Sequence, residues 1–126
     1  MQHPPYTLSV ITDEFSPRLE DGIAFAVEEG LTTVDVRSID AVNFLSLDRP
    51  AQERVARQIK AAGLKVGCLA TPLLKWAAPG KEAATMGDQF GFDAGGRSTE
   101  DLYGDAFEAA ALLGTRNLRI FSFLTV

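Results

Sequence analysis

Apolar residues along this chain follow two spacings in alternation, one helical and one typical of strands. Three times, a stripe of apolar side chains at helical intervals ends at a glycine, and a short apolar or β-branched run follows. The glycines are Gly30, Gly63 and Gly114, and each stands where the end of a helix favours a left-handed residue. The pattern predicts a repeated helix-to-strand unit.

The predicted strands cover residues 6–12, 32–37, 65–71 and 117–123. Residues that can cap a helix precede each helical stripe, namely Ser16 before Pro17, then Asp48, then either Ser98 or Thr99. The resulting order is β-α-β-α-β-α-β. Strands joined through helices run parallel with right-handed crossovers, so we expect an α/β protein built from parallel βα units.

The alternation of side chains within the strands favours a barrel over an open sheet. Val34 and Val36 would face the helices, leaving Asp35 and Arg37 on the other side. An open, doubly wound sheet is covered by helices on both faces and prefers apolar residues at both parities. We therefore expect the first half of a TIM barrel. The same alternation places further residues on the helix side, namely Leu118, Ile120, Val66 and Cys68.

We expect one domain over residues 1–126, with a short tail at residues 1–5. A long glycine-rich loop, residues 77–97, follows the third predicted strand. In parallel α/β proteins, ligands bind at the edge where the carboxyl ends of the strands meet. The loop therefore belongs to the side of the molecule where we expect a binding site.

Composition narrows the class of protein. The 126 residues carry a net charge of -5, which argues against nucleic-acid partners and anionic membranes. A single cysteine, Cys68, excludes an internal disulfide and predicts a buried packing group in a reducing, cytoplasmic setting. We see neither a signal peptide nor an apolar run long enough for a membrane span. The only histidine, His3, lies in the tail, so catalysis by a serine or cysteine paired with histidine is not expected.

Charged residues follow the first two predicted strands. Asp13 and Glu14 could bind a metal, a sugar hydroxyl or a proton, or could simply favour the positive end of the next helix. Arg37 has the geometry that suits carboxylates and phosphates, and its structural alternative is a salt bridge to Asp35, Asp13 or Asp40. For both sites, the functional and the structural interpretations remain open.

The third and fourth strands contribute further candidates. Thr71 ends the third strand, and Lys75 and Trp76 follow it. Lys75 could meet an anionic substrate and Trp76 could stack on a sugar, although for each residue in isolation a surface lysine and a packing tryptophan are the more common outcomes. Arg119 should have a buried partner, with substrate contact as its second role. Phe121, two residues later, would lie on the same side of the strand as Arg119.

Four segments after successive strands resemble a known family. They are Thr12-Asp13-Glu14-Phe15-Ser16, Val34-Asp35-Val36-Arg37, Thr71-Pro72-Leu73-Leu74-Lys75 and Arg119-Ile120-Phe121-Ser122-Phe123. The sequence is similar to the sugar phosphate isomerase/epimerase family of xylose-isomerase-like TIM barrels. The resemblance covers most of the chain, roughly residues 6–123, and implies a small-molecule sugar or polyol as the partner. Positions that line the substrate side in this family correspond here to Asp13, Glu14, Arg37, Thr71, Lys75 and Phe121.

The resemblance also implies a divalent metal (Mn, Mg or Zn) that assists isomerisation or epimerisation in the complete barrel. The family's metal ligands come from later strands, whereas this chain ends at Val126, after the fourth predicted strand. A full barrel takes about 250 residues. We therefore expect no metal in this chain alone, and no activity from it alone.

Two alternatives accompany this reading. Two copies could pair into an eight-stranded barrel and form an enzyme from duplicated half-sites. Otherwise the chain could be a non-catalytic half-barrel that acts as a self-associating binding or scaffold module. In both cases the exposed sheet edges predict a homo-oligomer.

Overall fold

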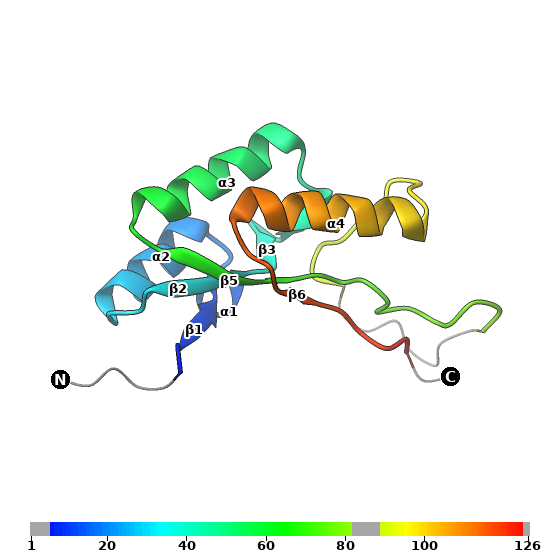
Figure 1. The fold of residues 1–126 in the computed structure, drawn as a ribbon, viewed down its shortest axis with the longest axis horizontal. Helices are drawn as coiled ribbons and strands as arrows, with labels where there is room; N and C mark the ends of the chain where they lie inside the picture. The colour runs from blue at the N-terminus through cyan, green and yellow to red at the C-terminus, as the bar shows by residue number, and fades with distance from the viewer. Residues whose placement is uncertain (1–5, 82–88, 125–126) are drawn as a thin grey trace.

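The computed structural model describes residues 6–81 and 89–124 and shows an α/β protein (Figure 1). Within this part of the chain, four parallel strands form one sheet in the order β1-β2-β5-β6. The strands are β1 (Ser9–Ile11), β2 (Thr33–Val36), β5 (Lys65–Ala70) and β6 (Leu118–Arg119). Neighbours in the sheet are also neighbours in the alternating β-α order, which confirms the predicted parallel βα units.

Three longer helices connect the strands: α2 (Leu19–Glu28), α3 (Arg49–Ala61) and α4 (Thr99–Leu113). Asp48 accepts a hydrogen bond from the N–H of Ala51 and caps α3, as predicted. Ser98, rather than Thr99, caps α4 and forms a reciprocal capping box with Asp101. Gly30, Gly63 and Gly114 all adopt the predicted left-handed conformation.

The first helical segment differs from the prediction. A short turn, α1 (Thr12–Phe15), follows β1 directly, and α2 begins only at Leu19. Ser16 does not cap α2. Its hydroxyl oxygen accepts from the N–H of Arg18 and its hydroxyl donates to Asp21, 2.7 Å away. The hydroxyl therefore stabilises the turn between the two helices.

The outer strands are shorter than predicted. Residues 6–8 precede β1 outside any strand, and β6 ends at Arg119. Beyond Arg119 the chain still bonds to its neighbour, since the N–H of Phe121 donates to the carbonyl of Leu73. The backbone there is irregular, because Leu74 and Phe123 both have positive φ angles. This irregularity ends the strand.

A β-bulge in β5 reverses which of its later side chains face the helices. Val34 pairs with Val66, but Asp35 pairs with Cys68, so Gly67 is the additional residue. A side chain at Gly67 would meet Thr33 and Asp35 at 2.8 and 2.9 Å, which explains the glycine. The prediction that Cys68 faces the helices is therefore wrong. Leu69, 1% exposed, takes the helix-facing position instead.

A small hairpin follows β2 and was not predicted. Strands β3 (Ser38–Ile39) and β4 (Val42–Asn43) pair antiparallel around Asp40 and Ala41, both of which have positive φ angles. The 3-10 helix η1 (Phe44–Ser46) continues from the hairpin into the core, where Phe44 is fully buried. The hairpin thus holds the segment after β2 against the body of the protein.

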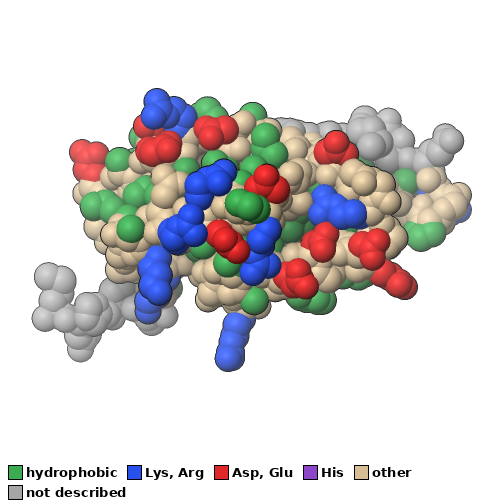
Figure 2. Space-filling view, turned by 90° about the horizontal axis from the view of Figure 1, so that it is seen from above, with side chains coloured by type: hydrophobic (Ala, Val, Ile, Leu, Met, Phe, Trp, Pro, Cys, Tyr) green, Lys and Arg blue, Asp and Glu red, His purple; other side chains and the backbone are tan. Residues whose placement is uncertain are grey.

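The core lies between one face of the sheet and the helices. Apolar residues of all three longer helices join Val34 and Val36 in one cluster, and Figure 1 shows α3 and α4 on the same side of the strands. The outward side of this layer mixes charges of both signs with small hydrophobic areas (Figure 2). No helix in the described ranges is long and apolar enough to cross a membrane.

The opposite face of the sheet is open and polar. Side chains of the other parity line a shallow hollow of about 500 Å³ there, including Ser9, Thr33, Asp35, Cys68 and Asn117. Ser9 donates to Asp35 across the face at 3.0 Å. Burial raises the pKa of Cys68, and the charge of Asp35 raises it further. Within the described residues, helices cover only one side of this parallel sheet.

Candidate functional site

Arg37 and Asp13 form a buried ion pair where β1 and β2 end. The Arg37 Nη2 lies 2.6 Å from Asp13 Oδ1, and its Nε donates to both carboxylate oxygens at 3.0 and 3.1 Å. Their side chains are 11% and 7% exposed. Among the salt-bridge partners proposed for Arg37, the structure selects Asp13. The turn α1 makes this possible, because it brings Asp13 back over the carboxyl end of β2.

Two further residues complete the pair. Ser38 donates to Asp13 Oδ2 through its backbone N–H at 3.1 Å and also through its hydroxyl. Glu14 accepts from Arg37 Nη2 at 2.9 Å, although its own side chain is 61% exposed. Asp13 is therefore enclosed by donors, whereas Glu14 keeps most of its surface in solvent.

Asp13 should stabilise the fold at neutral pH and lose this contribution in acid. Burial raises the pKa of Asp13, but hydrogen bonds from Arg37 and Ser38 and the charge of Arg37 outweigh burial, so its pKa lies below the usual value. A carboxyl group whose pKa is lower in the folded chain stabilises the fold above its unfolded pKa of about 3.9. That stabilisation disappears as the pH falls through the folded-state pKa.

We expect the urea midpoint of the wild-type protein to fall more steeply than that of Asp13→Asn between about pH 5 and pH 2. The asparagine keeps the shape of the side chain but cannot titrate, so it is the matched control. Equal pH dependence of the two midpoints would show that Asp13 titrates alike in the folded and unfolded chains.

An aromatic ring contacts two cations at this edge of the sheet. Phe90, from the long loop, lies 3.9 Å from the Arg37 guanidinium carbon and 4.2 Å from Lys75 Nζ, measured to the ring centroid. Lys75 Nζ is also 5.4 Å from the ring centroid of Phe121. Cations over aromatic faces are attracted by the ring quadrupole. The arrangement links the segments after β2, β5 and β6.

Arg119 extends the row of cations and rings. Its guanidinium carbon lies 4.6 Å from the ring centroid of Phe121, and its Nη2 donates to the carbonyl of Thr71 at 2.9 Å. The Nε is buried and has no hydrogen-bond partner among the described residues. Burial lowers the pKa of Arg119, and the charge of Arg37 lowers it further. The partners of Arg119 are thus the carbonyl of Thr71 and the ring of Phe121. Among the described residues, no carboxylate forms a salt bridge with Arg119.

Thr71 has a structural position in this site. Its side chain is fully buried, and its hydroxyl donates to the carbonyl of Arg119 at 2.5 Å while accepting from the N–H of Leu73 at 3.2 Å. Both capacities of the hydroxyl are occupied by backbone. Thr71 therefore connects the ends of β5 and β6 and supports Arg119.

The hairpin holds Phe90 in place. The N–H of Asn43 donates to the carbonyl of Gly91 at 3.1 Å. Phe90 itself has a φ angle of 54°, a strained conformation for a residue with a side chain. A shallow hollow of about 310 Å³ lies between the hairpin and the ion pair, and Asp13, Arg37 and Phe90 are among its lining residues.

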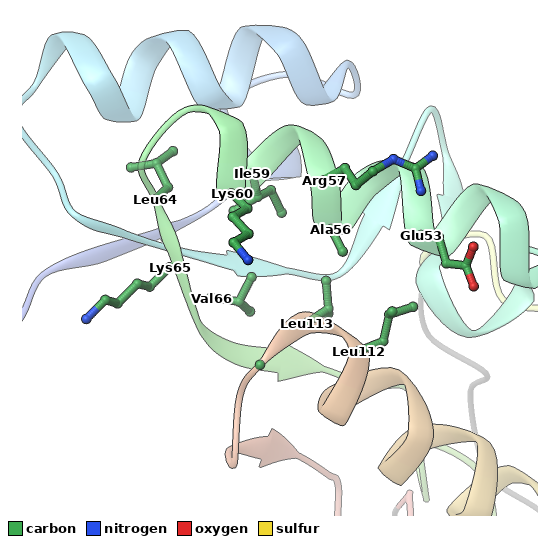
Figure 3. Close-up of a pocket in the computed structure, with 11 residues that line it drawn as sticks. Glu53, Ala56, Arg57, Ile59, Lys60, Leu64, Lys65, Val66, Leu112 and Leu113 are labelled. Atoms are coloured by element: carbon green, nitrogen blue, oxygen red, sulfur yellow. The ribbon is translucent and has the colours of Figure 1, made fainter.

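A larger hollow of about 680 Å³ lies between α3 and α4 (Figure 3). Its floor is apolar, with Ile59, Val66 and Leu113, and Arg57 and Lys60 stand at its rim. It contains none of the predicted site residues. Size alone would favour this groove, but it is on the helix side of the sheet, away from the carboxyl ends of the strands.

The structure therefore brings all six predicted site residues to one edge. Five of them have side chains in the row of charges and rings, namely Asp13, Glu14, Arg37, Lys75 and Phe121, whereas the hydroxyl of Thr71 is bonded to backbone. Sequence reasoning did not identify Ser38 or Phe90. Ser38 directly follows Arg37 and its hydroxyl was a weak signal. Phe90 lies inside the long loop, where no periodicity fixes the direction of a side chain.

The described residues do not fit a divalent metal. No group of three or more histidine, cysteine, aspartate or glutamate side chains gathers in residues 6–81 and 89–124 in a way that could hold an ion. Asp13 is also saturated by Arg37 and Ser38. No chemical step is therefore assigned to a metal in the described part of the chain.

Comparisons with known proteins found no relative of this chain. No family model, curated protein or solved structure matches the chain.

Proposed function

We propose that this chain forms the first half of a barrel of the sugar phosphate isomerase/epimerase kind, and that the edge just described is its substrate mouth. The substrate class is a sugar or polyol, isomerised or epimerised in the complete barrel. The observation that carries the proposal is the convergence of Asp13, Glu14, Arg37, Lys75 and Phe121 from separate strands. Active sites of TIM barrels are built at this same end of the strands.

The topology supports a barrel. Strand order follows sequence order without reversal, and helices cover one face in the described residues. In a doubly wound sheet the order reverses at a switch point and helices cover both faces. The open face carries polar and charged side chains, as expected for an interior that approaches a polar mouth.

Each side chain at the mouth has a distinct role in this proposal. The exposed carboxylate of Glu14 would accept hydrogen bonds from sugar hydroxyls, and Lys75 would donate to a hydroxyl or carbonyl oxygen. The rings of Phe90 and Phe121 would pack against the C–H face of the substrate. Asp13 would hold Arg37 in position and would not act as a base, because all its hydrogen bonds fix it in the ionised form.

Calorimetric titration of the chain with a panel of aldoses, ketoses and polyols tests the proposal. We expect at least one sugar to bind, and Lys75→Gln to weaken binding by at least about tenfold, since a hydrogen bond from a charged group contributes roughly 1.5–3 kcal/mol. Lys81→Gln, at an exposed position at the start of the following loop, is the matched control and should leave affinity unchanged. Absence of binding across the panel, or an equal loss in both variants, would contradict the proposal.

A further inference from the structure

We propose that Ser46 is a positioning residue for the substrate mouth. Its hydroxyl holds residues 89–97, the end of the long loop, against the body of the protein. Through this loop segment it fixes Phe90, whose ring contacts Arg37 and Lys75. The effect on sugar binding rests on the function proposed above. The position of Phe90 is measured without sugar, so the two proposals can fail separately.

Ser46 is bonded to the loop backbone in both directions. Its hydroxyl donates to the carbonyl of Asp93 at 2.9 Å, and the same oxygen accepts from the N–H of Asp93 at 2.8 Å. Ser46 is the last residue of η1, which begins at the fully buried Phe44. Because the core holds η1 in place, Ser46 is a fixed point to which the exposed Asp93 is attached.

Arg97 holds the same loop segment from its other side. Its Nε donates to the carbonyl of Ala94 at 2.6 Å, and its Nη2 donates to the carbonyl of Asp93 at 3.1 Å. Its Nη1 donates to Asp105 of α4 at 2.8 Å. The guanidinium therefore joins two loop carbonyls to a helix, which suits its rigid fork of donors. The carbonyl of Asp93 thus accepts from both Ser46 and Arg97.

The beginning of the loop segment is attached beside the mouth. Gln89 donates through Nε2 to the carbonyl of Lys75 at 2.9 Å, and the carbonyl of Gly91 accepts from the N–H of Asn43 at 3.1 Å. Phe92 packs against the hydrophobic core. All of these partners lie in the middle of the chain, so the segment is positioned by residues that the structure describes on both sides of it.

Phe90 needs these attachments because its backbone is strained. Its φ angle of 54° lies in the left-handed region, where a residue with a side chain stays only if its surroundings hold it there. The glycines of the loop segment adopt the same region at little cost. Phe90 is the one residue with a side chain in residues 89–97 that has a positive φ angle. A weakened attachment therefore releases strain at the residue that carries the ring.

The backbone between Asp93 and Phe90 transmits the position of the attachment. Asp93 follows Phe90 by three residues. Between them, Gly91 lies so close to the hairpin that an added Cβ would stand 1.9 Å from the carbonyl oxygen of Ala41. Close-packed segments transmit a displacement rather than absorb it. We therefore expect a shift of Asp93 to move the Phe90 ring, whereas a role of Ser46 confined to loop stability would leave the ring in place.

Nuclear magnetic resonance of three variants tests the position of the ring. In Ser46→Ala, the proton shifts of the Lys75 side chain should change, because the Phe90 ring moves relative to Lys75 Nζ. Ser46→Thr keeps a hydroxyl and should retain the wild-type shifts. Ser9→Ala is the matched control, since it also loses a serine hydroxyl and its hydrogen bond, here to Asp35, but at the amino end of β1. Urea denaturation at neutral pH confirms that each variant is folded.

Calorimetry with a sugar that binds the wild-type chain tests the effect on binding. We expect Ser46→Ala to weaken binding about threefold to tenfold, because only the fraction of molecules with a correctly placed ring binds with full affinity. Ser46→Thr and Ser9→Ala should bind as the wild type does. Rescue by threonine distinguishes the hydrogen bonds to Asp93 from the bulk of the side chain.

Three results would overturn the proposal. Unchanged Lys75 shifts in Ser46→Ala would show that the other attachments hold the ring by themselves. Changed shifts with unchanged sugar affinity would show that the position of the ring has no part in binding. Equal effects of Ser46→Ala and Ser46→Thr would exclude the hydroxyl as the cause. If no sugar binds the wild-type chain, the function proposed above is contradicted, and the Lys75 shifts still decide whether Ser46 positions Phe90.

Discussion

Replacing Arg37 with alanine should lower the free energy of unfolding by about 3–5 kcal/mol, because the substitution leaves the buried carboxylate of Asp13 without its charged partner. The ion pair combines bidentate geometry with side chains that are 11% and 7% exposed. Urea denaturation at neutral pH measures the change. Arg37 thus holds the ends of β1 and β2 together through its contact with Asp13.

Matched variants separate this buried pair from ordinary surface charges. Arg49→Ala removes an exposed guanidinium that pairs with Glu53 one helical turn away, and it should cost about 0.5 kcal/mol or less. The double variant Asp13→Ala/Arg37→Ala should lose less free energy of unfolding than the two single variants together. Each single substitution leaves one buried charge without its partner, whereas the double variant removes both charges. If Arg37→Ala and Arg49→Ala had equal effects, the pair would not be a structural anchor.

Replacing Gly91 with alanine should displace Phe90 from the two cations. An added Cβ would stand 1.9 Å from the carbonyl oxygen of Ala41, at a φ angle of 70°. The loop must then move away from the hairpin, with loss of the hydrogen bond from Asn43. We expect a loss of roughly 2–3 kcal/mol from backbone strain and the broken bond together.

Gly95→Ala is the matched control for this prediction. Gly95 has a φ angle of 60°, but an added Cβ there meets nothing within 4 Å, so only the cost of the left-handed conformation remains. Proton shifts of the Lys75 side chain report on the Phe90 ring current and should change in Gly91→Ala alone. Equal stability and equal Lys75 shifts in both variants would show that the contact with the hairpin does not position Phe90.

Local signals in the sequence were sufficient for most of the fold. Gly30, Gly63 and Gly114 marked helix ends because only a left-handed residue satisfies the last carbonyls there, and all three have φ angles between 73° and 77°. Asp48 marked a helix start for an equally local reason. These features depend on neighbours in the chain, so sequence spacing suffices to find them.

The predictions were wrong where contacts between residues far apart in the sequence determine the structure. The bulge at Gly67 depends on the side chains of Thr33 and Asp35 in the next strand, and one additional residue reverses the parity of everything after it. The hairpin turn at Asp40 and Ala41 contains no glycine or asparagine, the usual signals for such a turn. Neither feature leaves a periodic trace in the sequence.

In the candidate site, too, local features were predicted and features that depend on distant contacts were not. That Asp13, Arg37 and Lys75 share an edge followed from their places after parallel strands. Which acid would pair with Arg37 did not follow, because the choice depends on the turn α1. The contribution of Phe90 depends on how a long loop packs on the hairpin, and sequence alone does not encode that packing in a local pattern.

Nuclear magnetic resonance tests most directly the proposal that a sugar or polyol binds at the edge formed by the ends of β1, β2, β5 and β6. Backbone amide shifts of the labelled chain would be followed during titration with the sugars that bind by calorimetry. We expect the shift changes to cluster at Glu14, Lys75, Phe90 and Phe121. Shifts that cluster instead in the groove between α3 and α4, around Ile59, or no shifts at all, would contradict it.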